Sequence, residues 1–472
     1  MSIFKPKSNF SKKTFIPIYE QDDGEGSFVW FTSRFLDMTY NYSLREVIKD
    51  AAGKNDSVYG DVYTENLRKQ IPDNFCLYPF IHFQLDPDGR ARPCCKYKVG
   101  DASWQHNVPK LPDVNIGELW EQEEFQSLRE QFLKNERPTG CKACWDEEAA
   151  GITSMRLQRE QGGKEHPYAT FYHHIPRLYP KTLDLKLSNL CNLKCRICTP
   201  FLSSQWIKEI KDLKVLDMGA VDSFTNNSRE KFLEDPDNIE ILKTWAPGLE
   251  FLEFYGGEPL MQQEHDRVLE IIHQYGKPEN MGLYYNTNST VLKEKFFELW
   301  KLFREVIINF SVDDCGPRFE FQRKNAKWEE SLYNIKMFKE YGKKHGVNLD
   351  LRIYVTVGVL NVFYLKEFFE EIKSLGIKVT LNMVHYPHHY AITILPDKIK
   401  DIIRDKLLTI DTNIVRHDSL NIDNIIKFMY NTEHNPKLLE TFWHKTEIHD
   451  GYRNESYEDT FSEFYDLLRE YK

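Results

Sequence analysis

The sequence predicts an α/β protein in which a parallel sheet follows a small β-hairpin module and precedes a helical region. From Lys181 onward, six apolar stretches of strand length alternate with stretches of helical periodicity. This alternation is typical of a parallel sheet whose strands are joined by right-handed helical crossovers. Upstream, the turn signal Pro87-Asp88-Gly89 separates two strand-like stretches, and after Pro396 the periodicity is helical.

The elements of the α/β region follow from this periodicity. The predicted strands cover residues 182–187, 249–255, 282–286, 305–312, 350–357 and 377–384. The predicted helices between them cover 204–213, 262–275, 291–303, 328–345 and 364–375, and those of the C-terminal region cover 397–408, 420–430, 435–445 and 458–471. In parallel barrels the chemistry lies at the carboxyl ends of the strands, so polar residues there are the first site candidates.

The N-terminal part predicts a hairpin from strands over 75–86 and 90–95, followed by an amphipathic helix over 121–134. We therefore divide the chain into four parts. These are an N-terminal extension (1–70), a hairpin-plus-helix module (71–150), the α/β region (178–395) and the helical region (396–472). We assign no chemistry to the extension.

Composition excludes some classes of protein. The chain has 472 residues, of which 41% are apolar, and this length predicts two or three domains. The net charge of −10 argues against a general nucleic-acid binder, which presents a basic surface. The sequence contains neither the apolar run of a transmembrane helix nor the apolar core of a secretory signal. It therefore predicts a cytoplasmic protein that does not bind membranes.

The nine cysteines lie mostly in tight groups, which without a signal peptide favours metal binding or catalysis over disulfides. Cys191, Cys195 and Cys198 form a C-x3-C-x2-C loop directly after the first strand of the α/β region. A 4Fe–4S cluster takes four ligands, so three cysteines leave one iron open to a small molecule. The alternative is a zinc site, which usually combines two C-x2-C pairs, and no such partner pair follows this loop.

This cysteine loop resembles that of the radical S-adenosylmethionine (SAM) enzymes. The resemblance implies a partial (β/α)6 barrel, a reducing 4Fe–4S cluster held by the three cysteines, and SAM bound to the open iron. It also implies reductive cleavage of SAM to a 5′-deoxyadenosyl radical that abstracts hydrogen from a substrate carbon. An electron donor such as flavodoxin or ferredoxin is the implied partner.

The turn after the second of these strands, Gly256-Gly257-Glu258-Pro259, matches the family motif that binds the SAM amino group. Two glycines let the backbone approach a ligand closely. Alone, these four residues indicate only a turn. Their place at a strand end, downstream of the cysteine loop, favours a role in SAM binding.

Short polar residues end the next two strands: Asn286 and Asn288, then Ser311 and Asp313. The resemblance implies that they contact the SAM ribose, and the alternative is helix capping, for which these residue types are preferred. Arg323 lies after the fourth of these strands. It is a candidate for a bidentate pair with the SAM carboxylate, with a solvent-exposed arginine as the alternative.

Cys76, Cys94, Cys141 and Cys144 form a second candidate metal site. Their C-x12-G-x4-C and C-x2-C spacings resemble the auxiliary iron–sulfur domains called SPASM and twitch, of which the one-cluster twitch version fits better. In the family this domain usually follows the radical SAM core, whereas here it precedes it. A structural zinc site is the alternative, and Cys95 is expected to be a buried neighbour of the ligands.

Two further expectations concern the substrate. His385, His388 and His389 follow the sixth of these strands and predict a polar rim at the barrel mouth, with a metal site as the alternative. The resemblance favours modification of a peptide or protein, and a dehydrogenase or tailoring enzyme of a sugar-like small molecule is the alternative. The rival from another class is a non-catalytic scaffold protein with structural metal sites.

Overall fold

The computed structural model describes residues 70–98, 108–149, 153–157, 179–216, 218–417 and 419–472. The predicted N-terminal extension, except for its last residue, lies outside the described residues. The chain forms two compact units, the first made of 1–81, 96–98 and 126–180 and the second of 82–95, 99–125 and 181–472. The hairpin and the C-terminal helices thus share a unit with the barrel strands, whereas the sequence predicts separate domains for them.

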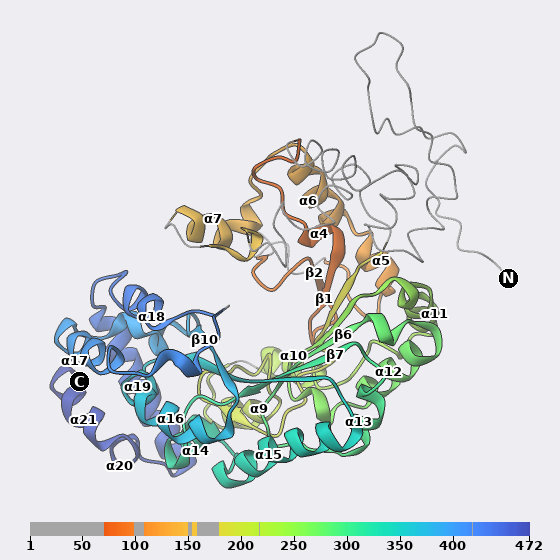
Figure 1. Ribbon diagram of the computed structural model, residues 1–472. Coiled ribbons are helices and arrows are strands. Elements are labelled where there is room, and N and C mark those ends of the chain that lie inside the picture. The colour runs from red at the N-terminus through yellow and green to blue at the C-terminus, as the bar shows by residue number, and fades with distance from the viewer. Residues whose placement is uncertain (1–69, 99–107, 150–152, 158–178, 217, 418) are drawn as a thin grey trace, which may run out of the picture. The chain divides into compact units, whose positions relative to one another are not determined.

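The second unit is built on an eight-stranded sheet with the order β10-β9-β7-β6-β5-β3-β1-β2 (Figure 1). Its strands are β1 His82–Leu85, β2 Ala91–Arg92, β3 Thr182–Leu185, β5 Phe251–Phe254, β6 Gly282–Thr287, β7 Glu305–Ser311, β9 Leu349–Val357 and β10 Lys378–Met383. All six strands predicted for the α/β region form, and they pair in parallel. The α/β class with a partial (β/α)6 barrel is therefore confirmed.

The hairpin differs most from its prediction. Tyr78–Ile81, predicted as strand, forms the short helix α4, and β2 contains only two residues. β1 pairs in parallel with β3, with Gln84 opposite Asp184, and the antiparallel strand β2 forms the edge of the sheet. The hairpin therefore extends the barrel sheet, through a pairing between distant segments that local sequence patterns do not encode.

One face of this sheet is apolar. Alternate side chains of a strand point to opposite faces, and residues opposite one another in neighbouring parallel strands share a face. Four fully buried residues in successive strands lie on the apolar face: Leu183, Leu252, Leu283 and Val306. Rings from α12 (Gln263–Tyr275), α13 (Lys295–Trp300) and α15 (Trp328–His345) pack against the aromatic residues of this face.

The opposite face is polar. The register places on it six residues from successive strands: His82, Asp184, Glu253, Tyr284, Asn309 and Arg352. Parallel strands that are buried on both faces usually read as continuous apolar runs. Thr182, Asp184 and Lys186 alternate with leucines in the first strand, and Glu253 interrupts an apolar run in the second, so the sequence contains a signal for a polar face that the sequence analysis did not recognise.

The helices predicted around these strands form as well. Besides those already named, they are α9 Gln205–Asp212, α16 Leu365–Ile372, α17 Asp397–Leu407, α18 Ile422–Met429, α19 Pro436–Arg453, α20 Tyr457–Thr460 and α21 Ser462–Leu468. The helix α19 runs past its predicted end and stops where Asn454 adopts the left-handed conformation, with φ of 51°. Helices α10 Met218–Asn226, α11 Pro236–Trp245 and α14 Gly316–Gln322 were not predicted.

Further described elements lie in the N-terminal part of the chain. In the first unit they include the 3-10 turn Thr139–Cys141, α7 Lys142–Ala149 and the 3-10 turn Met155–Leu157. The helix α5 (Ile116–Trp120) belongs to the second unit, and α6 (Glu123–Leu133) contains residues of both. The predicted amphipathic helix over 121–134 is thus present as α6.

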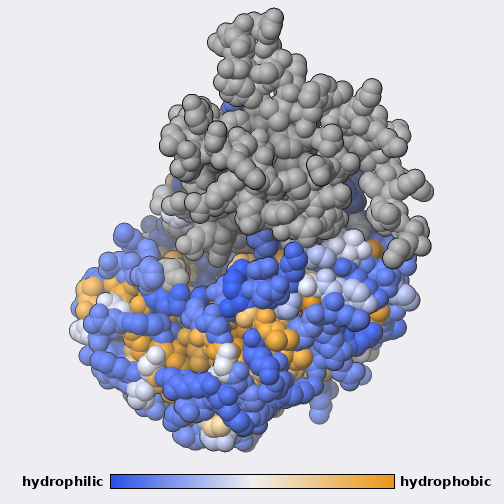
Figure 2. Space-filling view, turned by 45° about the vertical axis from the view of Figure 1, so that its right-hand side comes forward, coloured by the Kyte–Doolittle hydropathy of each residue, from blue (hydrophilic) through white to orange (hydrophobic). Residues whose placement is uncertain are grey.

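The surface of the described residues is mixed. Figure 2 shows hydrophilic side chains over much of this side of the molecule, with apolar side chains gathered in a band between them. Within the part of the chain that the structure describes, no helix combines the length and the hydropathy that crossing a membrane requires.

Candidate functional site

The three cysteines of the loop lie between β3 and α9. Cys195 belongs to the two-residue strand β4 (Lys194–Cys195), which pairs in antiparallel fashion with β8 (Arg323–Lys324), so that Cys195 lies opposite Arg323. The Cys198 amide donates to the Cys195 carbonyl at 3.0 Å. The Leu193 amide donates to Cys191 Sγ at 3.4 Å. The loop is therefore folded back on itself and attached to the segment after β7.

The three thiols influence one another. Burial and the neighbouring Cys195 together raise the pKa of Cys191 to about 12. Burial also raises the pKa of Cys198, and both other thiols add to this effect. Three thiols in mutual range, of which Cys191 is buried and the other two are half-buried, disfavour their thiolate forms unless a metal centre compensates the charge. The loop thus fits a cluster that takes three thiolates.

The Gly256-Gly257 turn packs against this loop. The Gly257 amide donates to the Leu202 carbonyl at 3.1 Å, and the Glu258 amide donates to the Leu190 carbonyl at 2.8 Å. Gly257 has φ of 55°, and a Cβ atom there would lie 2.2 Å from the Leu190 carbonyl oxygen. The close approach of the cysteine loop therefore requires this glycine, whereas the sequence analysis attributed it to a ligand.

The Glu258 side chain is fully buried and forms hydrogen bonds with protein groups. Its carboxylate accepts hydrogen bonds from Thr287 Oγ1 at 2.8 Å and from the Asn288 amide at 2.7 Å. Burial raises the pKa of Glu258 to about 7. Asn288 in turn donates to Asn192 Oδ1 at 2.8 Å and contacts Cys191 Sγ at 3.8 Å. Glu258 and Asn288 therefore connect two strand ends to the cysteine loop.

Gln262 is a further bracing residue, which the sequence analysis missed. Its Nε2 donates to the Gly256 carbonyl at 3.1 Å and to the Ser188 carbonyl at 3.3 Å. Pro259, the last residue of the predicted motif, is buried at the start of the 3-10 turn Pro259–Met261 that leads to Gln262. Since a glutamine after a turn has no distinctive spacing, the sequence offers no signal for this role.

Arg323 lies beside the cysteine loop, so the alternative of a solvent-exposed arginine is wrong. Its side chain is 7% exposed, and its Nη1 lies 3.7 Å from Cys195 Sγ. Its Nη2 donates to Asp313 Oδ2 at 2.6 Å, and Asp313 Oδ1 accepts from the Thr356 amide at 2.9 Å. Both carboxylate oxygens of Asp313 are thus engaged within the protein. Arg323 Nε is buried without a hydrogen-bond partner among the described residues, so it fits a ligand beside Cys195.

The other predicted strand-end residues have different surroundings. Asn286 and Ser311 both lie on the polar face near the ends of β6 and β7 and are half-buried. Within the described ranges, Asn286 Oδ1 is buried without a hydrogen-bond partner. This orphaned acceptor fits the hydroxyl or amino group of a ligand at the carboxyl edge of the sheet.

The three histidines after β10 do not form a compact metal site. In the described part of the chain, one group of three possible metal ligands has its donor atoms within 4.8 Å of one another. None of His385, His388 and His389 belongs to that group. The His385 ring packs on Phe428 at 5.0 Å, and burial lowers the pKa of His389 to about 4. These contacts agree with a polar rim.

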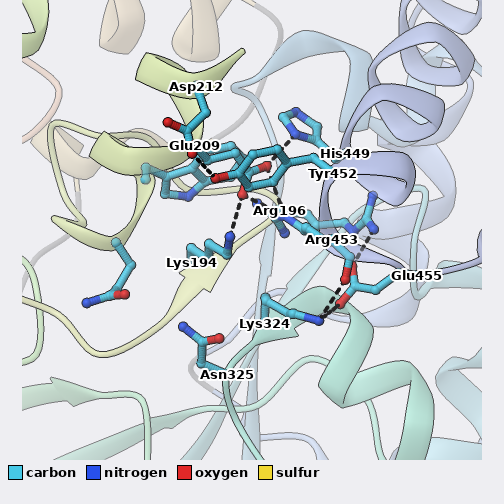
Figure 3. Close-up of polar contacts among 12 residues, drawn as sticks. Lys194, Arg196, Glu209, Asp212, Lys324, Asn325, His449, Tyr452, Arg453 and Glu455 are labelled. Carbon is cyan, nitrogen blue, oxygen red and sulfur yellow. Dashed lines mark hydrogen bonds and ion pairs between the residues drawn. The ribbon is translucent and has the colours of Figure 1, made fainter.

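A buried ion-pair network attaches the cysteine loop to the C-terminal region (Figure 3). Glu209 of α9 is fully buried and accepts from Lys194 Nζ and His449 Nδ1, each at 2.7 Å, and from Arg453 Nε at 3.0 Å. Burial opposes ionisation of Glu209, but these partners hold its pKa at about 2. The helix α19 is therefore tied through a carboxylate to the residue before Cys195.

Arg196, the residue after Cys195, is tied to the same region. Its guanidinium pairs with Asp450 at 2.5 Å and with Glu455 at 2.7 Å, and it lies over the Phe321 ring. Lys324 pairs with Glu455 at 2.9 Å, as Figure 3 also shows. The two residues that flank Cys195 are thus fixed by charges from the helical region, a role that the sequence analysis did not assign to it.

The first unit contains three of the four predicted auxiliary cysteines. Burial raises the pKa of Cys76, and proximity to Cys141 and then to Cys144 raises it further, so the three thiols lie in mutual range. Burial also raises the pKa of Cys144. Cys94 belongs to the second unit and is half-buried. Cys95, expected to be buried, is exposed.

The segment around these thiols is held by two buried arginines. Arg129 Nε donates to the Pro79 carbonyl at 2.8 Å. Arg156 donates to the Asp73 and Phe75 carbonyls at 2.8 and 3.0 Å, and it pairs with Glu148 at 2.6 Å. These contacts fix the backbone next to Cys76 against α7, so the three thiols of this unit have a rigid frame.

The sheet is open and parallel, with three clustered thiols after one strand and polar groups at the ends of the next strands. These features define a partial-barrel protein that depends on an iron–sulfur cluster. A radical SAM superfamily model matches residues 185–357, and the SPASM model, an iron–sulfur cluster-binding domain, matches residues 76–145. The chain therefore contains a radical SAM domain, and its cluster-binding domain lies N-terminal to the radical SAM domain.

Curated relatives match part of this chain. The GTP 3',8-cyclases of Staphylococcus aureus strains Mu3 and Newman are each 23% identical to it over 195 residues, which are 40% of this chain and 51% of the relative. The chain thus spans about half the length of the curated relatives it matches.

Solved structures with a similar fold include native anSMEcpe with bound AdoMet and Cp18Cys peptide. It has 15% identity, a TM-score of 0.33, and coverage of 48% of this chain and 58% of that chain. Streptococcus suis SuiB bound to precursor peptide SuiA has 14% identity, a TM-score of 0.31, and coverage of 59% and 61%.

The two matched domains identify the cofactors. A radical SAM domain binds a 4Fe–4S cluster and SAM, and a SPASM domain binds auxiliary iron–sulfur clusters. The buried thiols and the orphaned polar atoms described above are chemically suited to these groups, since iron–sulfur clusters are held by thiolates.

Proposed function

We propose that this protein cleaves SAM reductively and abstracts hydrogen from a carbon of a peptide or protein substrate. The observation that supports this most is the convergence of three thiols in one loop braced by Gly257, Asn288 and Arg323. When bound, the cluster and SAM supply one-electron chemistry and a 5′-deoxyadenosyl radical. The chain's own residues hold the loop rigid and exclude water from it.

The proposed ligands follow the predicted residues. Cys191, Cys195 and Cys198 hold the reducing cluster, and Cys76, Cys94, Cys141 and Cys144 hold the auxiliary cluster. The SAM contacts come from Gly256, Gly257, Glu258, Pro259, Asn286, Ser311, Asp313 and Arg323. The geometry divides this last set, because Glu258 and Asp313 already bond to protein groups and therefore act as positioning residues.

Arg323 has a specific electrostatic role in this proposal. Burial raises the pKa of Cys195, and the Arg323 guanidinium is the strongest influence that opposes this rise. A cation 3.7 Å from Sγ favours the thiolate that a cluster requires. Its ion pair with Asp313 fixes the guanidinium in this position.

Two classes of substrate are candidates, a peptide or protein and a small molecule. The cluster-binding domain supports a peptide or protein, since the family resemblance associates such domains with peptide modification. The partial similarity to enzymes named GTP 3',8-cyclase supports a small molecule instead. Adding GTP to the enzyme with SAM and a chemical reductant tests the second candidate, because a substrate accelerates formation of 5′-deoxyadenosine and yields a modified product.

The same proposal includes a cytoplasmic location and an electron donor such as flavodoxin or ferredoxin. One-electron carriers of this kind match the need of an iron–sulfur cluster for low-potential electrons. Replacing the chemical reductant by reduced flavodoxin in the cleavage assay tests the partner directly.

The first prediction tests the cluster loop. Replacing Cys191, Cys195 and Cys198 together by Ala should remove about four irons per chain and abolish SAM cleavage, because the thiolates are the ligands of the cluster. Iron and sulfide are measured chemically, and 5′-deoxyadenosine is measured after anaerobic reduction. Iron that remains in this variant belongs to the N-terminal cluster.

Cys315→Ala is the matched control, because Cys315 is a half-buried thiol of the same unit outside the loop. It should keep the iron content and the activity of the parent. SAM cleavage by the triple variant would contradict the proposal, and zinc in place of iron in the N-terminal domain would show a structural site there.

A further inference from the structure

The polar face of the sheet contains a group of donor atoms that the proposed function does not use. His82, Asp184 and Glu253 each offer one ligand atom, and these atoms lie within 4.8 Å of one another. They come from the neighbouring strands β1, β3 and β5. All three belong to the second unit, outside the cysteine loop.

The histidine is oriented as a metal ligand. The Pro93 carbonyl can only accept, so His82 Nδ1, at 3.0 Å from it, must donate. This tautomer leaves the lone pair on Nε2, and a hydrogen bond from the other ring nitrogen to a carbonyl is the usual support of a metal-binding histidine. Burial lowers the pKa of His82 to about 4, so the ring is neutral at physiological pH.

The nearest cation to Asp184, Lys186, is shared with Asp86. Lys186 lies 3.1 Å from Asp86 but 3.9 Å from Asp184, and Arg92 also pairs with Asp86. Lys186 therefore interacts with both carboxylates and lies closer to Asp86. Glu253 accepts a hydrogen bond from the Tyr255 hydroxyl at 2.9 Å.

Two buried oxygens at this place have no donor. Asp184 is 3% exposed, and among the described residues its Oδ1 has no hydrogen-bond partner. The same holds for Oε1 of Gln84, which is 1% exposed and lies opposite Asp184 in the β1–β3 pairing. A buried oxygen that accepts no hydrogen bond lowers the stability of the fold. Two such oxygens beside the lone pair of a histidine therefore indicate a cation that binds at this place.

We propose that His82, Asp184 and Glu253 bind a divalent transition-metal ion on the polar face of the sheet, with Gln84 as a neighbouring oxygen donor. One imidazole nitrogen and two carboxylates suit Mn²⁺, Fe²⁺ or Zn²⁺. Glu253 is only half-buried, so the ion has a route to this site. Burial and the nearby Asp184 raise the pKa of Glu253 to about 8, an effect that a bound dication would reverse.

The test uses Mn²⁺, which prefers oxygen and nitrogen ligands and therefore leaves cysteines aside. The holoprotein with its iron–sulfur clusters is freed of other metals with a chelator and titrated with MnCl₂ under anaerobic conditions. The free-ion electron paramagnetic resonance signal reports binding. We expect one Mn²⁺ per chain, and a loss of affinity of about tenfold or more in Asp184→Asn and in Glu253→Gln.

Asp350→Asn is the matched control, because Asp350 is a carboxylate of the same sheet face that pairs with Arg352 and Arg416. It should leave Mn²⁺ binding unchanged. If the Asp184→Asn variant fails to fold, the Mn²⁺ affinity of the Glu253→Gln variant still tests the proposal. Absence of stoichiometric binding by the parent, or equal affinity in parent and all variants, would overturn the proposal. The measurement requires no SAM cleavage, so it is independent of the proposed function.

Discussion

The two faces of the sheet differ in how their side chains are satisfied. On one face Phe254 stacks on Tyr285 at 5.2 Å, and the Tyr285 hydroxyl accepts a hydrogen bond from Trp300 Nε1 and donates one to His265 Nε2. On the other face Asp184 and Glu253 lie close together, and oxygens of Gln84 and Asp184 lack donors among the described residues. The first face is complete within the protein, whereas the second is suited to ligands. Alternate residues of the same strands therefore serve stability and chemistry separately.

The substitution Phe254→Ala tests the apolar face and should cause the largest loss of stability. Phe254 is fully buried, and removing a buried aromatic ring costs about 3–5 kcal/mol of unfolding free energy. Denaturant unfolding of the holoprotein measures this loss. SAM affinity of the folded fraction should remain unchanged, and a selective loss of SAM affinity would show that the two faces are not independent.

Asn286→Ala tests the polar face near the cysteine loop. Because its buried Oδ1 has no partner in the described structure, its removal should leave the melting temperature nearly unchanged. SAM affinity should fall about tenfold, or roughly 1.4 kcal/mol, by isothermal titration. Asn382→Ala is the matched control, since Asn382 lies on the same face in the edge strand β10. Equal affinities in both variants would remove Asn286 from the SAM site.

The substitution Glu253→Gln should cause the smallest change, a shift in melting temperature that depends on pH. The folded protein raises the pKa of Glu253 from 4.5 to about 8, so the folded state holds this proton more tightly than the unfolded state does. Stability from this proton is therefore present at low pH and lost as the pH rises towards 8. In metal-free protein, the melting temperature of the parent should fall relative to the variant by about 2 °C between pH 6 and 8. A difference in melting temperature between parent and variant that does not change with pH would contradict the raised pKa of Glu253.

Local patterns in the sequence predict much of this protein. The six strands and the helices between them follow from alternating apolar periodicity, which depends only on neighbouring residues. The C-x3-C-x2-C spacing and the turn at residues 256–259 are equally local, so the sequence also predicts where the reducing cluster and SAM belong.

Long-range pairing decides the remaining features. β1 joins β3 across about 100 residues, and this register brings His82 to Asp184 and Glu253. In the same way, the antiparallel pairing of Arg323 with Cys195 buries an arginine that the sequence left as either exposed or SAM-binding, and an ion pair with Asp313 holds it beside the cysteine loop. Sequence spacing cannot reveal such contacts, because hydrogen bonds between distant strands set which side chains share a face.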